Sequence, residues 1–420
     1  MKRTICVIGN GYVGLPLAVA FAKRYRTISF SPSAEHTAEL REGYDRTKSF
    51  NAEALQSSGV HFTSDIEEIK EANIYIVTVP TPIDERKNPD LSPIESATRM
   101  IASVLKKDDL VVYESTVFIG CTEELCVPLL EEGSGLKYNE DFFCGYSPER
   151  INPADKVHTL DTVKKIVSGS TPGIASFLEE LYGSIVPAGI HKAPAMKVAE
   201  ASKLIENVQR DLNIALMNQL SMLFDKLGVE TNDVLDAAAT KWNFHRYSPG
   251  LVGGHCISVD PYYLIYNGLR SNMPMTLVET QREVNEHMPE FIGLKLLSLL
   301  DEKGFTAQKS RILILGIAFK ENCPDIRNTK VVDIYRHIRE KVADIDIYDP
   351  VVNTDEVMNA YGLKCYNEEN VLAGKRYDAV IIAVAHQAFQ KMDLDQYLNE
   401  NAVIYDLKSI LPREKSDARL

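Results

Sequence analysis

The hydrophobic residues in the first half of the chain come in short blocks that are separated by amphipathic stretches. The block Thr4–Ile8 is rich in β-branched residues and stops at Gly9, and helical periodicity follows from Leu15 to Arg24. Similar blocks recur at residues 27–30, 74–79, 110–113 and 165–168. Helix-like segments, such as the one at 94–105, separate them. This alternation predicts a parallel sheet that is covered by helices on both faces.

The pattern changes at Ala195, where hydrophobic residues begin to repeat with the 3.6-residue period of a helix. The repeat runs from Met196 past Leu223 with almost no glycine or proline, which predicts one long helix. Such a helix suits either a bridge between domains that also forms a dimer surface, or a plain core helix. A second series of strand-like blocks then follows at residues 311–315, 344–348, 378–384 and 402–405.

We therefore expect an α/β protein with two Rossmann-like doubly wound domains joined by a long central helix in a helical middle domain. The Pro- and Gly-containing loops place the domains at residues 1–194, 195–304 and 305–420. A chain of 420 residues with 45% hydrophobic residues is long enough to fill two or three cores.

Charge and cysteine content exclude several classes of protein. A net charge of −13 argues against nucleic-acid and anionic-lipid partners. No segment reaches the roughly 18 consecutive apolar residues of a membrane span, and the apolar run at the amino terminus is read as a strand rather than a signal peptide. The seven cysteines lack metal-type spacing. We expect a cytoplasmic protein with reduced thiols and no metal.

The segment from Gly9 to Gly14 has the sequence Gly-Asn-Gly-Tyr-Val-Gly and joins the first strand to the first helix. Glycines at this spacing permit a tight turn and let a pyrophosphate approach the first amides of a helix, so the motif predicts dinucleotide binding. The second strand should end with an acid that accepts the ribose hydroxyls, but Ser31 stands there. A serine accepts a 2′-hydroxyl weakly and tolerates a 2′-phosphate, yet no arginine follows to neutralise one. NAD remains the favoured cofactor.

Cys256 follows two glycines and precedes Asp260 by four residues. Small neighbours leave a thiol open to substrate, and a cysteine lets a dehydrogenase carry an alcohol past the aldehyde through a thiohemiacetal and a thioester. An inert buried cysteine is the alternative. The adjacent His255 points to the opposite face of an extended segment and is interpreted as structural.

Lys203 and Asn207 are four residues apart on the predicted long helix and therefore project from one face. An ammonium and an amide donor together suit an oxyanion. A solvated helix face is the alternative interpretation of the same spacing.

Taken in order along the chain, these motifs resemble the UDP-glucose/GDP-mannose dehydrogenase family over essentially the whole length. The resemblance rests on Gly9–Gly14, Val79–Pro82, Glu114–Val117, Ser147–Arg150, Lys203 with Asn207, Gly253–Cys256 with Asp260, and Phe319–Asn328. It implies an amino-terminal NAD domain, a helical centre that forms a homodimer or higher homo-oligomer, and a carboxy-terminal domain for the UDP-sugar.

The resemblance also implies roles for individual residues. Cys256 would be the nucleophile, Lys203 and Asn207 would stabilise oxyanions, Asp260 and Thr116 would hold the catalytic water, and Glu149 would assist acid/base steps. Cofactor contacts would come from Gly9, Gly11, Tyr12, Val13, Gly14, Ser31, Thr81 and Thr116. Substrate contacts would come from Glu149, Arg150, Lys203, Asn207, Gly253, Tyr263, Lys320 and Arg327.

Within this family, the segments Thr240–Phe244, Pro249–Cys256 and Val259–Leu264 look like the branch that acts on UDP-N-acetylhexosamines. The nearest resemblance is to bacterial UDP-N-acetylgalactosamine and UDP-N-acetylglucosamine 6-dehydrogenases of surface-polysaccharide (capsule or O-antigen) pathways. The sequence leaves the epimer open, because small loop changes accommodate one axial hydroxyl. A UDP-glucose or UDP-N-acetylmannosamine 6-dehydrogenase, and a nucleotide-sugar-binding relative impaired in cofactor binding, are the alternatives.

Overall fold

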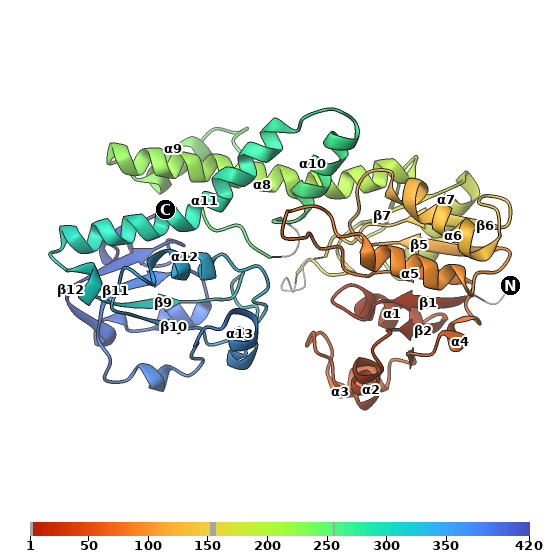
Figure 1. Cartoon of the computed structure of the whole chain (residues 1–420), viewed down its shortest axis with the longest axis horizontal. Helices are drawn as coiled ribbons and strands as arrows, with labels where there is room; N and C mark the ends of the chain where they lie inside the picture. Colours follow the sequence, from red (N-terminus) through yellow and green to blue (C-terminus); the bar gives the residue numbers. More distant parts are fainter. Residues whose placement is uncertain (1–2, 152–156, 255–256) are drawn as a thin grey trace. The chain divides into compact units, whose positions relative to one another are not determined.

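The computed structural model describes residues 3–151, 157–254 and 257–420 (Figure 1). The chain divides into two compact units, the first made of Met1–Glu206 with Tyr262–Pro274 and the second of Asn207–Pro261 with Met275–Leu420. Helix α8 (Met196–Leu227) continues from the first unit into the second. The predicted fold class is confirmed, and the three predicted domain bounds stay a prediction.

The first unit is built on an eight-stranded sheet with the order β3-β2-β1-β4-β5-β6-β7-β8 (Figure 1). Its strands are β1 (Thr4–Ile8), β2 (Arg26–Phe30), β3 (His61–Thr63), β4 (Ile74–Val77), β5 (Asp109–Tyr113), β6 (Phe142–Tyr146), β7 (Lys165–Gly169) and β8 (Ile190–Lys192). Its helices are α1 (Gly14–Ala22), α2 (Ala34–Glu42), α3 (Ala52–Gln56), α4 (Ile66–Ile69), α5 (Ser92–Ala102), α6 (Val127–Ser134) and α7 (Pro172–Gly183), with a π-helical turn at Thr122–Cys126 before α6.

Helices cover both faces of this sheet because successive residues of a strand point to opposite sides. Ile5 and Val7 of β1 pack in one cluster with Phe21 of α1 and Leu178 of α7. The hydroxyl of Tyr113, on the other side of β5, lies 3.0 Å from that of Thr98 in α5. Helices α1 and α7 therefore cover one face and α5 the other.

The sheet departs from the predicted all-parallel arrangement at β7, which pairs with β6 in the antiparallel sense. The other strand pairs run parallel. Between β6 and β7 the described residues form no crossover helix, which a parallel connection needs. The first residue of β7 therefore lies at the edge where β5 and β6 end.

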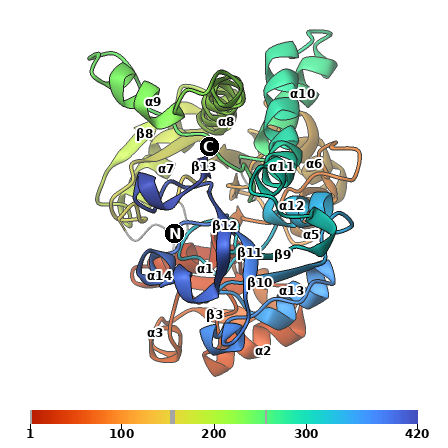
Figure 2. The same ribbon diagram turned by 90° about the vertical axis from the view of Figure 1, so that its left-hand side faces the viewer.

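The second unit contains a five-stranded parallel sheet with the order β10-β9-β11-β12-β13 (Figure 2). Its strands are β9 (Arg311–Leu315), β10 (Asp344–Tyr348), β11 (Tyr377–Ile382), β12 (Leu398–Asp406) and β13 (Ala418–Arg419). Its helices, besides part of α8, are α9 (Thr231–Ala239), α11 (Thr276–Glu302), α12 (Val331–Ile338), α13 (Thr354–Tyr361) and α14 (Gln387–Lys391). Helix α10 (Asp260–Arg270) begins in this unit and continues in the first.

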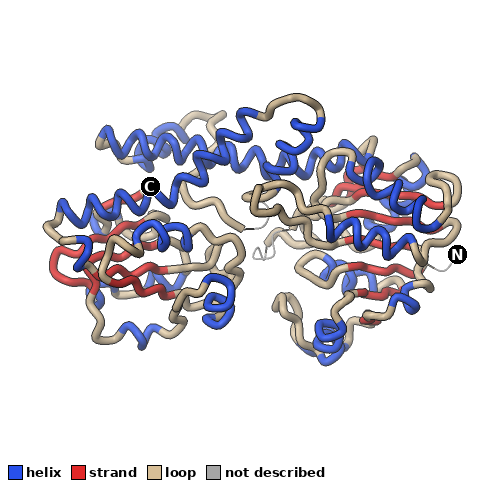
Figure 3. The backbone as a smooth tube through the Cα atoms, viewed as in Figure 1, coloured by secondary structure: helices blue, strands red, loops and turns tan. Residues whose placement is uncertain are grey.

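The alternation of strand residues again produces two cores. Ile312 and Ile314 of β9 pack with Ile292 of α11 and Ile334 of α12. Leu313, on the other face of β9, belongs to a separate cluster that includes a residue of α14. Figure 3 shows strands flanked by helices in each unit. The sheet is doubly wound, as expected for a Rossmann-like fold.

A buried polar network joins α8 to α11 within the second unit. The Asp211 carboxylate accepts hydrogen bonds from Arg282 at 2.7 Å, Gln281 at 2.9 Å and Asn285 at 2.7 Å. Burial raises the pKa of Asp211 although the Arg282 guanidinium opposes this. Among the residues that the structure describes, no helix is long and apolar enough to cross a membrane.

Candidate active site

The turn between β1 and α1 contains three glycines in three different environments. Gly9 has a φ of 103°, which favours glycine. A side chain on Gly14 would overlap the Gly9 carbonyl oxygen and the Thr78 hydroxyl, whereas no atom lies within 4 Å of the place that a Cβ of Gly11 would take. The space at Gly11 lets a phosphate approach the first amides of α1, so the turn fits the pyrophosphate of NAD. Tyr12 and Val13 lie partly buried in this turn.

The other residues predicted to contact the cofactor follow neighbouring strands. Ser31 follows β2, Thr81 comes after β4 and Thr116 comes after β5. Because β2, β1, β4 and β5 are adjacent and parallel, these residues lie at one edge of the sheet together with the glycine turn. The Ser115 hydroxyl donates to the Val79 carbonyl at 2.6 Å and ties the last two loops together. The structure thus brings the predicted cofactor residues to one edge.

Ser31 is buried at the end of β2. Its hydroxyl oxygen accepts a hydrogen bond from the Ser33 amide at 3.3 Å, and Ser33 in turn caps α2 by accepting from the His36 amide. A neutral hydroxyl that is already engaged is a weaker acceptor for ribose hydroxyls than a carboxylate would be.

Two side chains, from α10 and α8, fix the loop that carries Thr116. Asn267 of α10 accepts from the Ile119 amide at 2.8 Å and donates to the Ile119 carbonyl at 3.0 Å. Glu200 of α8 accepts from the Gly120 amide at 2.6 Å. Tyr263, predicted to contact substrate, is fully buried and donates to the Pro82 carbonyl at 3.2 Å. Helix α10 therefore anchors both loops, and a substrate contact by Tyr263 stays a prediction.

A buried cluster of charged groups lies at the same edge, where β5 and β6 end and β7 begins. Glu149 Oε1 accepts from the backbone amides of Arg150 and Ile151, both at 2.7 Å. Glu149 Oε2 lies 3.3 Å from Lys165 Nζ, which also donates to Glu114 Oε2 at 2.7 Å.

The charges of this cluster shift its protonation equilibria in different directions. Burial alone would raise the pKa of Glu149, but the Lys165 ammonium and the two backbone amides outweigh burial and lower it. At Glu114 burial dominates, and the pKa is raised although Lys165 opposes this. Burial would lower the pKa of Lys165, but the two carboxylates raise it. The cluster therefore favours an ionised Glu149.

Arg150, predicted to contact substrate, is held by other protein groups. Its guanidinium forms an ion pair with Glu206 at 2.8 Å and donates to the Lys164 carbonyl at 2.7 Å. A role of Arg150 toward substrate stays a prediction.

The predicted oxyanion donors lie on α8. Lys203 and Asn207 are both buried and one helical turn apart. Asn207 Nδ2 donates to Asp260 Oδ2 at 2.5 Å, so the structure brings together two predicted catalytic residues that are 53 positions apart. Asp260 is the first residue of α10. Cys256 and His255 lie outside the described residues.

The segment that leads to Cys256 is held at two points within the second unit. The Asn218 side chain donates to the Gly250 carbonyl at 3.0 Å and accepts from the Gly250 amide at 2.7 Å. Gly254 and Asn328 likewise bond to each other, and a Cβ on Gly253 would come within 2.5 Å of the Asn328 carbonyl oxygen. Only glycine fits at position 253, and a substrate contact by Gly253 stays a prediction.

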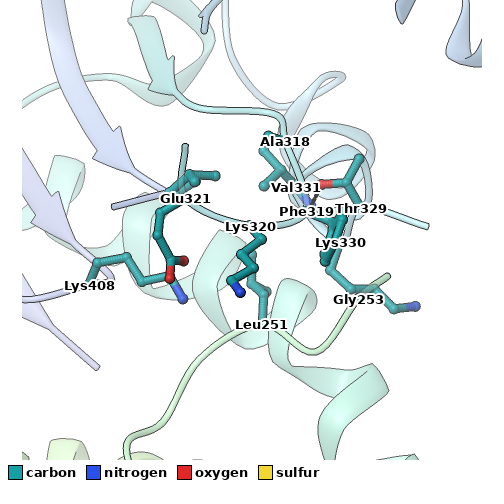
Figure 4. Close-up of a pocket in the computed structure, with 12 residues that line it drawn as sticks. Leu251, Gly253, Ala318, Phe319, Lys320, Glu321, Thr329, Lys330, Val331 and Lys408 are labelled. Atoms are coloured by element: carbon teal, nitrogen blue, oxygen red, sulfur yellow. Dashed lines mark hydrogen bonds between the residues drawn. The ribbon is translucent and has the colours of Figure 1, made fainter. Parts of the chain in front are cut away.

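A pocket lies at the carboxyl ends of β9, β11 and β12 (Figure 4). Because the strand order reverses between β9 and β11, this is the place where doubly wound sheets bind ligands. The predicted residues Gly253 and Lys320 line it. Its other lining residues are Leu251, Ala318, Phe319, Glu321, Thr329, Lys330, Val331, Ala383, Val384 and Lys408.

Three lysines give the pocket its positive charge. Figure 4 shows Lys408 beside Glu321 and Lys320 in the middle of the lining residues. Burial lowers the pKa of Lys408 although the Glu321 carboxylate opposes this. Ammonium groups with one carboxylate suit a diphosphate ligand. Arg327, predicted to contact the same ligand, is exposed, pairs with Asp325 at 2.6 Å and does not line this pocket.

Sequence reasoning assigned no role to five charged residues of these sites: Glu114, Lys165, Glu321, Lys330 and Lys408. Lys165 begins an apolar strand and Lys408 follows one, so a charge at the end of an apolar block was the available signal. Lys330 and Glu321 carry no such signal, because the fold alone brings them to the pocket.

Three family models match the chain in succession. The UDP-glucose/GDP-mannose dehydrogenase family is matched by its NAD binding domain at residues 3–186, its central domain at 197–287 and its UDP binding domain at 313–413. The glycine turn falls in the first match and the lysine-lined pocket largely in the third.

Individual proteins are similar over nearly their full length. A Pseudomonas aeruginosa protein named UDP-N-acetyl-D-glucosamine 6-dehydrogenase is 47% identical, with 99% of each chain covered. Protein CapL of Staphylococcus aureus is 43% identical, with 98% of this chain and 97% of that protein covered. The solved structure of a UDP-D-ManNAc dehydrogenase from Pyrococcus horikoshii has a TM-score of 0.89 at 30% identity and covers 99% of this chain and 98% of its own.

Proposed function

Because this chain belongs to the UDP-glucose/GDP-mannose dehydrogenase family, we propose that it oxidises the 6-hydroxyl of a UDP-N-acetylhexosamine to a carboxylate. It is an NAD-dependent nucleotide-sugar 6-dehydrogenase, with an NAD-binding and a UDP-binding domain. Among the hexosamines we favour UDP-N-acetylglucosamine, since the protein with 47% identity is named for that substrate.

The observation that carries the proposal is the hydrogen bond between Asn207 and Asp260. It joins an amide donor for an oxyanion to a carboxylate that can hold water, and Lys203 adds an ammonium one turn away on the same helix. Cys256 precedes Asp260 by four residues in the chain. These four groups are what a double oxidation of an alcohol requires.

The proposed chemistry has two oxidations and one hydrolysis. When bound, NAD would supply the acceptor for a hydride, which is two electrons and one proton, from carbon 6 at each oxidation. The first oxidation yields the aldehyde and releases the hydroxyl proton. The Cys256 thiolate then bonds to the aldehyde carbon, Lys203 and Asn207 stabilise the alkoxide, and the second oxidation leaves a thioester.

Hydrolysis completes the reaction. A water held by Asp260 and Thr116 bonds to the thioester carbon and loses a proton to Glu149, while the carbon–sulfur bond breaks and the thiolate leaves. The sum is alcohol, two NAD⁺ and water giving carboxylate, two NADH and three protons.

The test is to incubate the purified protein with UDP-N-acetylglucosamine, UDP-N-acetylgalactosamine, UDP-N-acetylmannosamine or UDP-glucose, each with NAD or NADP. We expect UDP-N-acetylglucosamine and NAD to give the highest kcat/KM, with two NADH formed per sugar consumed. Mass spectrometry identifies the uronic acid, and chromatography separates products of equal mass.

A pair of cysteine variants isolates the covalent stage. Cys256→Ala should form no uronic acid, while Cys365→Ala, which removes a buried thiol in the last domain, should keep both activity and stoichiometry. Release of free aldehyde with one NADH per sugar in the wild type would contradict the proposal. Higher kcat/KM with another UDP-sugar would correct the substrate.

We also propose that α8 forms a homodimer or higher homo-oligomer. Its exposed hydrophobic residues are separated by seven, eleven, seven and four positions, so they form one stripe along the helix. They are Val198, Ile205, Leu216, Leu223 and Leu227. Light scattering should show a dimer or larger assembly, and Leu216→Glu with Leu223→Glu should shift it to monomer. A monomeric wild type would contradict this.

The cytoplasmic location and a place in surface-polysaccharide synthesis stay predictions.

A further inference from the structure

The topology of the first sheet brings two carboxylates and one ammonium to the same edge. Glu114 follows β5 and Glu149 follows β6, which run parallel, so both lie at the carboxyl edge. Lys165 is the first residue of β7, and because β7 is antiparallel to β6 its beginning lies at that edge too. The Ser147 hydroxyl donates to the Ile166 carbonyl at 2.7 Å and fixes the two segments side by side.

These three groups are removed from water. The side chains of Glu114, Lys165 and Glu149 are 0%, 4% and 13% exposed. Tyr182 of α7 donates to Glu114 Oε1 at 2.5 Å, and its ring lies 5.5 Å from Lys165 Nζ. The one ammonium therefore balances two carboxylates and has no freedom to move toward solvent.

Both oxygens of Glu149 are oriented by this arrangement. Oε1 takes the Arg150 and Ile151 amides, and Oε2 faces Lys165 at 3.3 Å. A carboxylate with a fixed direction and an ionised state is what general-base catalysis needs.

We propose that Lys165 is a positioning residue that keeps Glu149 oriented to take the proton of the hydrolytic water, and that Glu114, anchored by Tyr182, keeps Lys165 in place. This inference rests on the proposed function, in which Glu149 accepts that proton.

The charged and titratable groups around Glu149 come from several elements. They are Lys165 on β7, Glu114 after β5, Tyr182 on α7 and the neighbouring Arg150 with its partner Glu206 on α8. Lys165 is the cation that lowers the pKa of Glu149, against the effect of burial. Without Lys165 the largest cause that lowers the pKa of Glu149 is lost, so that pKa rises.

The test measures the pH dependence of kcat for uronic-acid formation. Glu149→Gln defines the acidic limb that belongs to Glu149. In Lys165→Met we expect this limb to move to higher pH, with kcat at pH 5.5 reduced roughly tenfold more than at pH 8, while KM for the UDP-sugar stays unchanged. Lys165→Arg keeps the positive charge and should restore part of the profile. Lys164→Met, which removes the neighbouring exposed ammonium, should keep the wild-type profile.

A double variant separates positioning from folding. Lys165→Met leaves two buried carboxylates without a cation and should lower the unfolding midpoint. Glu114→Gln combined with Lys165→Met removes one of them and should recover much of the midpoint, while the acidic limb stays displaced. Recovery of both in the double variant, or a wild-type profile in Lys165→Met, overturns the proposal. A wild type that forms no uronic acid overturns the proposed function itself and this inference with it.

Discussion

The chain contains two Rossmann-like sheets whose first turns are occupied in opposite ways. In the first unit, the turn after β1 leaves open space at Gly11, and the second strand ends in the neutral Ser31. In the second unit, Asp349 follows the second strand, and its carboxylate bonds to the backbone of the same unit. Asp349 Oδ2 accepts from the Ile317 and Ala318 amides at 2.8 and 2.9 Å.

The amides that a pyrophosphate would need are therefore already used in the second unit. His386 Nε2 lies 3.1 Å from the same carboxylate oxygen, and the Asn322 amide donates to His386 Nδ1 at 2.8 Å. The turn at Gly316 also requires glycine, because a Cβ there would overlap Val384.

The same kind of sheet therefore does not determine which ligand is bound. One unit leaves open space at Gly11 beside the first amides of α1, which suits a dinucleotide. The other closes its turn with a carboxylate and presents Lys320, Lys330 and Lys408 around a pocket instead. Function resides in the groups that are grafted on the fold.

The largest effect is expected where the first turn is tightest. Gly14→Ala places a methyl group against the Gly9 carbonyl and Thr78, and should lower the free energy of unfolding by about 3 kcal/mol. Gly11→Ala meets no atom, so it should keep wild-type stability and weaken NAD binding. Urea unfolding and titration calorimetry with NAD measure the two effects. Gly173→Ala, on an exposed helix position, is the control, and a stable Gly14→Ala that binds NAD would contradict the comparison.

Next in size is the removal of the carboxylate that closes the second turn. Asp349→Asn should cost about 2 kcal/mol of unfolding free energy at neutral pH, because two buried amides lose a charged acceptor. Burial would raise the pKa of Asp349, but His386 and the backbone amides lower it.

A lowered pKa means that this stabilisation is fully present above the ordinary carboxyl value of about 3.9 and is lost as pH falls through the folded value. Urea midpoints of wild type and variant should therefore converge in acid. Asp355→Asn, on the exposed face of α13, should change little at any pH. A gap that widens below pH 4 would show that Asp349 does not act as an ionised cap.

A third effect should appear in the affinity for UDP. Lys408→Met removes an ammonium from the pocket and should weaken UDP binding about tenfold, which calorimetry measures as Kd. Because burial lowers the pKa of Lys408, wild-type affinity should decline at a lower pH than an ordinary lysine would dictate. Lys415→Met removes an exposed lysine of the same domain and should leave Kd unchanged. Equal Kd values for the two variants would mean that UDP does not bind in this pocket.

The smallest effect concerns the end of β2. Ser31→Asp supplies the charged acceptor that the ribose hydroxyls lack and should raise kcat/KM for NAD about threefold while lowering it for NADP. The ratio of the two values is the readout, with the exposed Ser57→Asp as control. An unchanged ratio would mean that position 31 does not face the ribose.

Most of the fold was predictable because hydrophobic periodicity dominates it. The strand at 4–8, the long helix from Met196 and the strand at 311–315 were placed within a residue or two. Strands β3, β6, β8 and β13 were missed. Strands β3, β8 and β13 have three residues or fewer, too few for a period to show, and β6 contains a glycine and no β-branched residue. The direction of β7 was not predictable, since a block of apolar residues reads the same in either direction.

The candidate site likewise has one part that was predictable from the sequence and one part that was not. The glycine turn and the Lys203–Asn207 pair are local patterns and were found from the sequence. Long-range meetings were not, because Asn207 bonds to a residue 53 positions away and Lys165 to Glu114 at a separation of 51. Lys408 reaches its pocket only through the order of the second sheet.

Hydrogen exchange of the full chain with NAD alone, and with UDP alone, tests most directly whether the two sheets divide the ligands as described. NAD should slow exchange of the amides at residues 11–15 and leave 317–320 unchanged, while UDP should slow exchange at 319–331 and 407–409 and leave the glycine turn unchanged. Protection of the turn after β9 by NAD, or of the glycine turn by UDP, would contradict the account.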